Sequence, residues 1–476
     1  MREIILPEIE DDENDRLRRH EDRDEYVNRR RETREADLAR EHTRRRAELR
    51  QAEESKKSKK APKKGQKKVC KKKIAVIVLS ILVLAAIITA VVLAVIKNQK
   101  NENGEPVAEG SNEPAPTIFY SKLTGLEIVR SGAQSNGLTY TVEEAKAIAD
   151  AYNAAPTYCM QIPNGADYNR IMAGLDNAAV MYEAVAEAGI TRFAMIFQNP
   201  TGSAIGPIRS LRMYYLDWDV PYDCTIVHAG GEENARIEAA SGKYRDLTES
   251  LTYMWRSNYG EYYAPNNLFT DASRLKNFNA NAGYKTSDYK AIARQTYETA
   301  KKQKEFIASY SKEDGTEKMK EAGLPTDAAK VTSIDIDFGT SITYNPMYEY
   351  DAEKNTYLRS YENGDKHTYR ICKESEQPKL SSCGKEIQVE ASAVAVIQVK
   401  EKTWMDRWNH AREDIETTGS GKAWIFQNGV YIPATWKRAT RNDQIEFIDS
   451  DGNKIEITPG QLWISAIPEK GRVKYE

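Results

Sequence analysis

The 476-residue sequence contains only five cysteines and five histidines, and this scarcity limits the chemistry that it can support. The spacing of the cysteines does not resemble a zinc site. The sequence has no GxSxG motif, no HExxH motif and no cysteine–histidine nucleophile signature. We therefore expect no bound metal, no cofactor and none of these familiar hydrolytic mechanisms.

The sequence also lacks a large net charge, since the formal value is −2 at pH 7, but its charges are strongly segregated. Residues 1–55 are dense in arginine, aspartate and glutamate and almost free of aromatic side chains. Such a segment cannot bury a core, so we predict a solvated tail that is helical or disordered. Acidic residues between the triplets Arg29–Arg31 and Arg44–Arg46 cancel their field, so we expect no nucleic-acid binding.

Charge and proline are absent from one long stretch, Ile74 to Ile96. About 20 helical residues cross the roughly 30 Å hydrocarbon layer of a bilayer, so we predict a single transmembrane helix over residues 74–96. The lysine-rich block Lys56–Lys73 precedes it, which predicts a charged cytoplasmic tail over residues 1–73 and an extracytoplasmic remainder after residue 97. The same lysines are expected to contact anionic lipid headgroups.

Residues 97–116 are rich in Asn, Glu, Gly and Pro, which predicts a flexible extracytoplasmic linker. Over residues 117–280, short strand-like runs alternate with helical stretches, a pattern typical of an α/β domain. The helical stretches are expected near Ile171–Ala188 and Leu211–Trp218. A further helix is predicted to begin after Thr141, because Glu144 completes a capping box with it.

The pattern changes again in the last third of the chain. Residues 281–330 are predicted to be a helical connector, because Lys285–Tyr310 carries apolar residues three and four positions apart. Over residues 331–476, alternating runs such as SIDIDF and turn pairs such as Asn428-Gly429 predict a mostly-β C-terminal domain. The expected fold is therefore an α/β ectodomain followed by a mostly-β domain, preceded by one transmembrane helix.

Four cysteines follow the predicted transmembrane helix, in a compartment that permits disulfides. Their local spacing favours a Cys372–Cys383 bond. A Cys159–Cys224 bond would then join two predicted strands. Four free, buried thiols are the alternative, because connectivity cannot be read from a sequence.

The strongest sign of a binding site lies between Tyr182 and Gly231, where Arg209 and Arg212 stand between two strand-like runs. On a helix beginning after Gly206-Pro207 these arginines would share a face near the helix N-terminus, which favours anions. Guanidinium forks suit carboxylates and phosphates, so we predict a site for an acidic ligand. The alternative is that both arginines form internal salt bridges with Glu183, Asp217 or Asp219.

His228 ends the second strand-like run and is followed by Gly230 and Gly231, which allow backbone to approach a ligand closely. Clefts of α/β sheets form at the carboxyl ends of strands, so these three residues join the candidate site. A structural role for the histidine is the alternative. Glu183 and Arg192 flank a glycine turn and are expected either to pair with each other or to contact the ligand.

The predicted β domain is rich in tryptophan. Core packing is expected for most of these side chains, and a sugar-stacking platform is the alternative. The residues are Trp404, Trp408, Trp424, Trp436 and Trp463.

Ten short motifs follow one another from Thr124 to Ile464. They are TGL at Thr124–Leu126, GL then VMYEA at Gly174–Ala184, GITRF at Gly189–Phe193, IGPIRS at Ile205–Ser210, VHAGG at Val227–Gly231, APNNLFT at Ala264–Thr270, YDAEKNTYLR at Tyr350–Arg359, GSGKAWIFQNG at Gly419–Gly429, TWKR at Thr435–Arg438 and TPGQLWI at Thr458–Ile464. This ordered set resembles the YerB-like family of bacterial surface lipoproteins, whose domain has no assigned biochemical function. The resemblance implies a YerB-like domain with its C-terminal β domain, held at a bacterial cell surface.

The sequence departs from the family pattern in several places. Cys70 precedes the apolar run, so it does not match a lipidated cysteine after a signal sequence, and a transmembrane anchor replaces it. Ala179 stands where the family has an acidic residue. Asn266 replaces the histidine of a Pro-His-Asn run whose last residue, Asn267, is retained and joins the candidate site through this resemblance.

These features predict a single-pass protein of the bacterial cell membrane whose outer region binds an acidic ligand, a wall polymer or an envelope protein such as a wall-synthesis enzyme. We favour a non-catalytic protein over an enzyme. One alternative is a wall-active glycan hydrolase with Glu183 and Asp217 as paired carboxylates. A second alternative is a transmembrane signalling or scaffold protein that acts through residues 1–55.

Overall fold

The computed structural model describes residues 115–169, 171–257, 264–311, 315–372 and 383–476. The predicted cytoplasmic tail, the predicted transmembrane segment Ile74–Ile96 and nearly all of the predicted linker lie outside the described residues. Within the described ranges, no helix is both long enough and apolar enough to cross a membrane.

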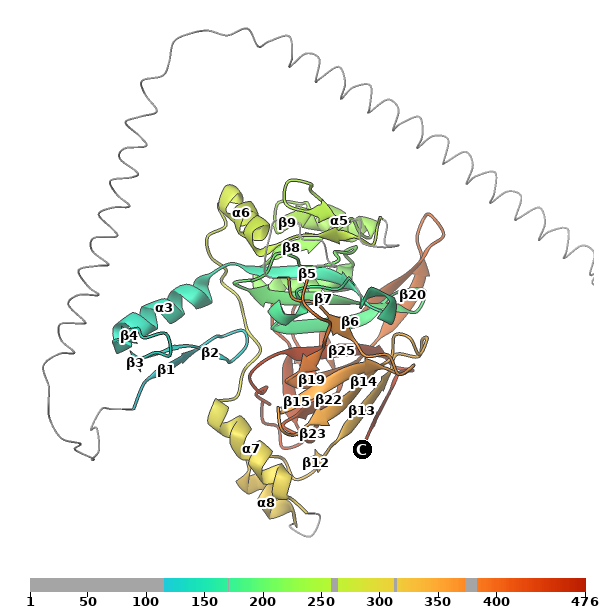
Figure 1. The fold of residues 1–476 in the computed structure, drawn as a ribbon. Helices are drawn as coiled ribbons and strands as arrows, with labels where there is room; N and C mark the ends of the chain where they lie inside the picture. The colour runs from blue at the N-terminus through green and yellow to red at the C-terminus, as the bar shows by residue number, and fades with distance from the viewer. Residues whose placement is uncertain (1–114, 170, 258–263, 312–314, 373–382) are drawn as a thin grey trace, which may run out of the picture. The chain divides into compact units, whose positions relative to one another are not determined.

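An 11-stranded sheet organises the described residues (Figure 1). In spatial order its strands are β12 (Ala329–Lys330), β23 (Val430–Arg438), β22 (Gly419–Gln427), β19 (Ala393–Val399), β25 (Leu462–Pro468), β6 (Val180–Glu187), β7 (Ile190–Gln198), β5 (Thr157–Pro163), β8 (Thr225–His228) and β9 (Arg245–Thr248), with β24 (Glu446–Asp449) paired to β23.

The α/β character of the first region and the β character of the second are confirmed, and both regions contribute strands to this one sheet. The junction is the parallel pairing of β25 with β6, in which Ser465 lies opposite Glu183. Strand β19 pairs parallel with the other side of β25. A strand close to the C-terminus therefore holds the two regions of the chain together.

Both faces of the central strands are covered, which explains their unbroken apolar sequences. In β6, Val180 and Tyr182 belong to one hydrophobic core, whereas Met181 and Val185 belong to the other. This follows from the two-residue period of a strand. The first core includes residues of four helices, α4 (Met213–Asp219), α5 (Glu233–Ala239), α7 (Tyr297–Ser309) and α8 (Gly315–Glu321).

The second core lies between the main sheet and a 5-stranded antiparallel sheet. The predicted strand SIDIDF is confirmed, because Ile334 and Ile336 point into this core and alternate with partly exposed residues. Helix α6 (Ala272–Ala282) also contributes Leu275 to it. The five strands are β18 (Glu390–Ala391), β15 (Thr356–Tyr361), β14 (Pro346–Asp351), β13 (Ser333–Asp337) and β26 (Arg472–Tyr475).

The remaining elements are small. Helix α3 (Val142–Ala154) begins with the predicted capping box between Thr141 and Glu144. The other strands form antiparallel pairs: β1 (Ile118–Tyr120) with β2 (Glu127–Arg130), β3 (Gly132–Ala133) with β4 (Thr139–Tyr140), β10 (Trp255–Arg256) with β11 (Leu268–Phe269), β16 (Thr368–Tyr369) with β17 (Ile387–Gln388), and β20 (Glu401–Met405) with β21 (Ala411–Ile415).

Two predicted helices differ from the structure. The helix expected at Ile171–Ala188 is wrong, because its second half is strand β6, whose apolar run is buried on both faces and imitates a helix pattern. The helix expected at Lys285–Tyr310 begins only at Tyr297, after its cap Thr296. The preceding residues are extended because their backbone amides bond to other segments, as Lys290 does to Pro221.

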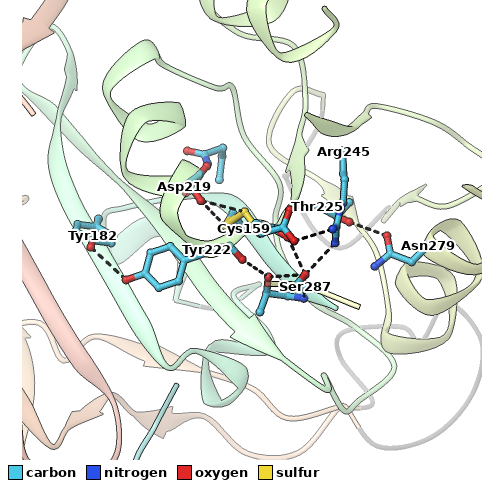
Figure 2. The surroundings of a disulfide bond; sticks show 12 residues. Cys159, Tyr182, Asp219, Tyr222, Thr225, Arg245, Asn279 and Ser287 are labelled. Carbon is cyan, nitrogen blue, oxygen red and sulfur yellow. Dashed lines mark hydrogen bonds and ion pairs between the residues drawn. A yellow bond between two sulfur atoms is a disulfide. The ribbon is translucent and has the colours of Figure 1, made fainter. Parts of the chain in front are cut away.

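Both predicted disulfides, Cys159–Cys224 and Cys372–Cys383, are present. Figure 2 shows that the first lies beside a buried hydrogen-bond network. There, the Ser287 hydroxyl donates to the Asp223 carbonyl at 2.7 Å and accepts from the Arg245 guanidinium at 2.9 Å. The disulfide joins β5 to the residue before β8, and the network holds the following chain against the same strands.

A buried ion pair connects the two sheets. Glu183 of β6 and Arg359 of β15 are 1% and 0% exposed, and one guanidinium nitrogen lies 3.0 and 2.9 Å from the two carboxylate oxygens. Asn164 and Thr191 also donate to the carboxylate, at 2.8 and 3.1 Å. The arginine Nε donates to the hydroxyl of Tyr348 at 3.1 Å.

The protonation of the neighbouring histidine supports this arrangement. Burial, together with the charge of Arg359, lowers the pKa of His367 well below its ordinary value. The neutral Nδ1 of His367, 2.9 Å from the arginine Nη1, accepts a hydrogen bond from it. Burial raises the pKa of Glu183, while the adjacent guanidinium opposes that shift.

Loss of this arginine should destabilise the fold strongly. Arg359→Met leaves Glu183 buried without its cation, so we expect the free energy of unfolding to fall by about 3–5 kcal/mol. Urea denaturation measures this change in the free energy of unfolding. The control Arg472→Met removes an exposed arginine from β26 and should change stability by at most about 0.5 kcal/mol. Adding Glu183→Gln to Arg359→Met should restore part of the lost free energy of unfolding. If Arg359→Met and Arg472→Met lowered the free energy of unfolding equally, this account would be contradicted.

Candidate functional site: an arginine cluster at the carboxyl ends of the central strands

Strands β5, β6 and β8 run in the same direction, because β5 is parallel to β8 and both β5 and β6 are antiparallel to β7. Their carboxyl ends therefore share one edge of the sheet, where ligand sites of α/β proteins form. Glu187 ends β6 and His228 ends β8 at this edge.

Three arginines converge on the carboxylate of Glu187. Arg192 and Arg212 form ion pairs with its two oxygens. Arg412, from the β20–β21 hairpin, donates to one of these oxygens at 3.1 Å. We call Arg192, Arg209, Arg212 and Arg412, with Glu187, the arginine cluster.

The cluster is buried and short of acceptors. Arg192 and Arg212 are 3% and 2% exposed. Among the described residues, Arg192 Nη1 and the Nε atoms of Arg209 and Arg212 have no hydrogen-bond partner. Buried donors normally find an acceptor, and the lack of one is costly. The cluster therefore favours binding of an anion.

Arg209 is partly exposed and lies near enough to Arg192 for their charges to repel each other. Its Nη1 donates to the amide oxygen of Asn266 at 2.5 Å. Burial, together with the charge of Arg192, lowers the pKa of Arg209 to about 10. The guanidinium is still charged near neutral pH, and an added negative charge would relieve the repulsion between the two arginines.

The predicted helix after Gly206-Pro207 is wrong. Helix α4 begins at Met213 and Arg212 is its extended N-cap, so Arg209 and Arg212 do not share a helical face. The backbone of residues 209–211 is extended because it bonds to β5 and to the turn after β8. The Arg209 carbonyl accepts from Ala229 at 2.9 Å, for example.

Gly230 and Gly231 allow the backbone after β8 to lie close to the backbone of residues 209–211. The Gly230 carbonyl accepts from the amide of Leu211 at 3.1 Å. A Cβ on Gly231 would lie 2.7 Å from the Leu211 carbonyl oxygen. The close approach that a glycine permits here is therefore to the protein's own backbone, and it positions the arginine-bearing segment.

His228 and Asn267 lie in internal hydrogen-bond networks. His228 is 1% exposed, with Nδ1 2.6 Å from the Gly230 carbonyl and Nε2 2.8 Å from Asp246. Asn267 is 5% exposed and donates to the Ser257 carbonyl at 2.7 Å. Neither side chain joins the arginine cluster in these contacts.

The acidic residues considered from the sequence have other partners. Glu183 and Arg192 do not pair, because Glu183 bonds to Arg359 and Arg192 to Glu187. Asp217 lies 2.6 Å from Arg441. The two carboxylates of the hydrolase alternative are thus each engaged by a separate arginine, and Glu183 is closed to solvent. The described residues contain no group of three metal-binding side chains.

Sequence reasoning missed Glu187 and Arg412. Glu187 lies in the segment for which the sequence predicts a helix, and Arg412 is separated from it by 225 residues. Their meeting depends on the packing of β21 against β6. No local pattern in the sequence indicates that contact.

The β20–β21 hairpin that supplies Arg412 also contains two carboxyl groups close together. Burial, together with the carboxylate of Glu413, raises the pKa of Glu401 to about 7, while Lys470 opposes the shift. The hydroxyl of Thr403 donates to Glu413 at 2.7 Å. Glu401 is therefore largely protonated in mildly acidic solution.

Because the folded pKa of Glu401 lies above its unfolded value, its contribution to stability is complete below about pH 4.5 and is lost as the pH rises through about 7. We expect Glu401→Gln to raise the melting temperature at pH 8 and to reduce its fall between pH 5 and pH 8. The exposed Glu298→Gln is the control. An unchanged pH profile in Glu401→Gln would contradict the raised pKa.

Comparison with known proteins identifies the family of the chain. Residues 143–285 match the family described as "Protein of unknown function (DUF3048) N-terminal domain", and residues 334–464 match its C-terminal domain. Together the two matches cover more than half of the chain. The chain belongs to this YerB-like family. The arginine cluster draws on both domains, since Arg412 lies in the second match.

One relative is the Bacillus subtilis (strain 168) protein named "Putative lipoprotein YerB", which is 26% identical over 305 residues. That alignment covers 63% of this chain and 78% of the relative. The crystal structure of YerB from Bacillus subtilis aligns with a TM-score of 0.52 at 21% identity, covering 75% of this chain and 99% of the solved one. The two proteins therefore share a fold.

Proposed function

We propose that this YerB-like protein is a non-catalytic, membrane-anchored binding protein of the bacterial envelope that recognises an acidic ligand through the arginine cluster. The proposal rests on the observation that Arg192, Arg212 and Arg412 all pair with the carboxylate of Glu187. Even after this pairing, the cluster keeps an excess of positive charge and three guanidinium nitrogens without partners among the described residues.

The chemistry of the cluster suits a carboxylate or a phosphate. Guanidinium groups bind these anions through short, charge-assisted hydrogen bonds, which are stronger in a partly dry site than in water. Arg209 provides the entry point because it is partly exposed and beside the buried arginines. An acidic wall polymer or an acidic segment of an envelope protein would meet this requirement.

The expected location supports such a ligand. Ile74–Ile96 has the length and composition of a membrane span, and the preceding lysines favour an extracytoplasmic C-terminal region. A relative whose name describes a lipoprotein is consistent with a place at the outer face of the membrane. The binding region would then lie between membrane and wall.

The hydrolase alternative has no observation in its favour, because Glu183 is held in a buried ion pair. Signalling through residues 1–55 concerns a part of the chain outside the described residues.

Sedimentation of the full chain, purified in detergent, with isolated cell-wall sacculi tests the proposal. We expect Arg209→Ala to weaken binding about tenfold, the usual consequence of losing a charge-assisted hydrogen bond. The matched control is Arg236→Ala, which removes an exposed arginine from α5. Arg209→Lys should bind between wild type and Arg209→Ala. No sedimentation of the wild type, or equal binding by all variants, would contradict the proposal.

A further inference from the structure

The tryptophans of the predicted β domain differ in exposure, and Trp404 is partly exposed. Trp424, Trp436 and Trp463 are 7%, 3% and 1% exposed, so core packing is confirmed for them. Trp408 is 64% exposed, in the turn between β20 and β21. An exposed tryptophan leaves a large apolar ring in water and is common at binding surfaces.

The turn holds Trp408 in a defined position. The carboxylate of Asp406 accepts from the backbone amides of Trp408 and His410, both at 2.9 Å. Partial burial raises the pKa of Asp406, but these amides and the side chain of Arg412 outweigh it and lower the pKa to about 2. Asp406 is therefore ionised at neutral pH, and the turn is pre-organised before a ligand arrives.

The same turn connects Trp408 to the arginine cluster. Arg412 donates to Asp406 at 3.0 Å and to Glu187 at 3.1 Å. Arg407 donates to Glu233, at the start of α5, at 2.8 Å. The β20–β21 hairpin packs against β6, the strand that Glu187 ends (Figure 1). The turn that carries the exposed ring is thus tied to the arginine cluster through Arg412.

The surroundings of the ring favour a sugar over a protein. Arg407 lies 4.6 Å from the centroid of Trp408, and the ring keeps most of its surface. Within residues 401–415, Met405 and Trp408 are the only large exposed hydrophobic side chains. A stable protein interface needs about 1,000 Å² of well-packed surface, which this charged tip does not offer. A pyranose ring needs only one aromatic face, because its polarised C–H groups are attracted to the negative face of an indole.

Resting on the proposed function, we propose that the ligand is an acidic glycan. Its acidic group binds the arginine cluster through Arg209, and a sugar ring of the same glycan chain stacks on Trp408. The site would then reject a neutral glycan, which lacks the charge, and would bind a small anion only weakly, because a small anion lacks the ring.

Calorimetric titration of the detergent-purified full chain tests this with three probes: a uronic-acid hexasaccharide, a neutral glucose hexasaccharide and inorganic phosphate. Trp408→Ala should weaken the affinity for the uronic-acid probe about tenfold and leave the affinity for phosphate unchanged. Trp408→Phe should retain most of the affinity. The matched control is Tyr297→Ala, which removes an aromatic side chain that is also 64% exposed. Arg209→Ala should weaken both the uronic-acid probe and phosphate.

The outcomes separate the inference from the proposed function. If phosphate or the uronic-acid probe binds through Arg209 but Trp408→Ala has no effect, the acidic-glycan inference fails and the anion site stands. If Trp408→Ala weakens phosphate binding as much as it weakens binding of the uronic-acid probe, the ring acts only through the fold of the turn. That result also overturns the inference. If neither anionic probe binds, both fail. If the neutral hexasaccharide bound as tightly as the uronic-acid hexasaccharide, the inference of an acidic glycan would be overturned. Capture of a protein that depends on Trp408, without any glycan binding, would also overturn it.

Discussion

The buried pair of Glu183 and Arg359 is the contact on which the architecture depends most. It joins the central strand of the main sheet to the smaller sheet, inside a core that excludes water. An ion pair at this depth is tolerable only because the surrounding hydroxyl and amide groups satisfy the remaining hydrogen bonds. It holds β6 against β15 of the smaller sheet, and β6 carries Glu187 at its end.

The arginine cluster follows from that placement but has the opposite electrostatic character. At Glu183 one cation meets one anion and few donors are left over, whereas at Glu187 three cations share one carboxylate, and Arg412 also pairs with Asp406. The first arrangement is complete without a ligand. The second leaves buried guanidinium nitrogens without acceptors among the described residues, and this imbalance is what an acidic ligand would correct.

Much of the fold could be predicted from the sequence because its signals are local. The capping box at Thr141, the Asn428-Gly429 turn between β22 and β23 and the Cys372–Cys383 disulfide agree with the structure. The predicted helix at Ile171–Ala188 failed because a strand buried on both faces has no two-residue alternation to reveal it.

The candidate site was predicted only in part for a similar reason. Arg192, Arg209 and Arg212 lie close in sequence, so their grouping could be predicted, but their partner Arg412 comes from the distant hairpin. The internal partner of His228, Asp246, becomes evident only when β8 pairs with β9. Long-range strand pairing therefore decides which polar side chains are free to bind and which are not.

Arginine side-chain NMR of the full chain during titration with the uronic-acid hexasaccharide tests the central claim most directly, because it observes the guanidinium groups themselves. The account predicts that the Nε–H signals of Arg209 and Arg212 shift together and saturate. The Nε–H signal of Arg359, which donates to Tyr348 in the core, should stay unchanged and serves as the internal reference. Unshifted signals for Arg209 and Arg212 at saturation, or an equal shift of Arg359, would contradict binding at the arginine cluster.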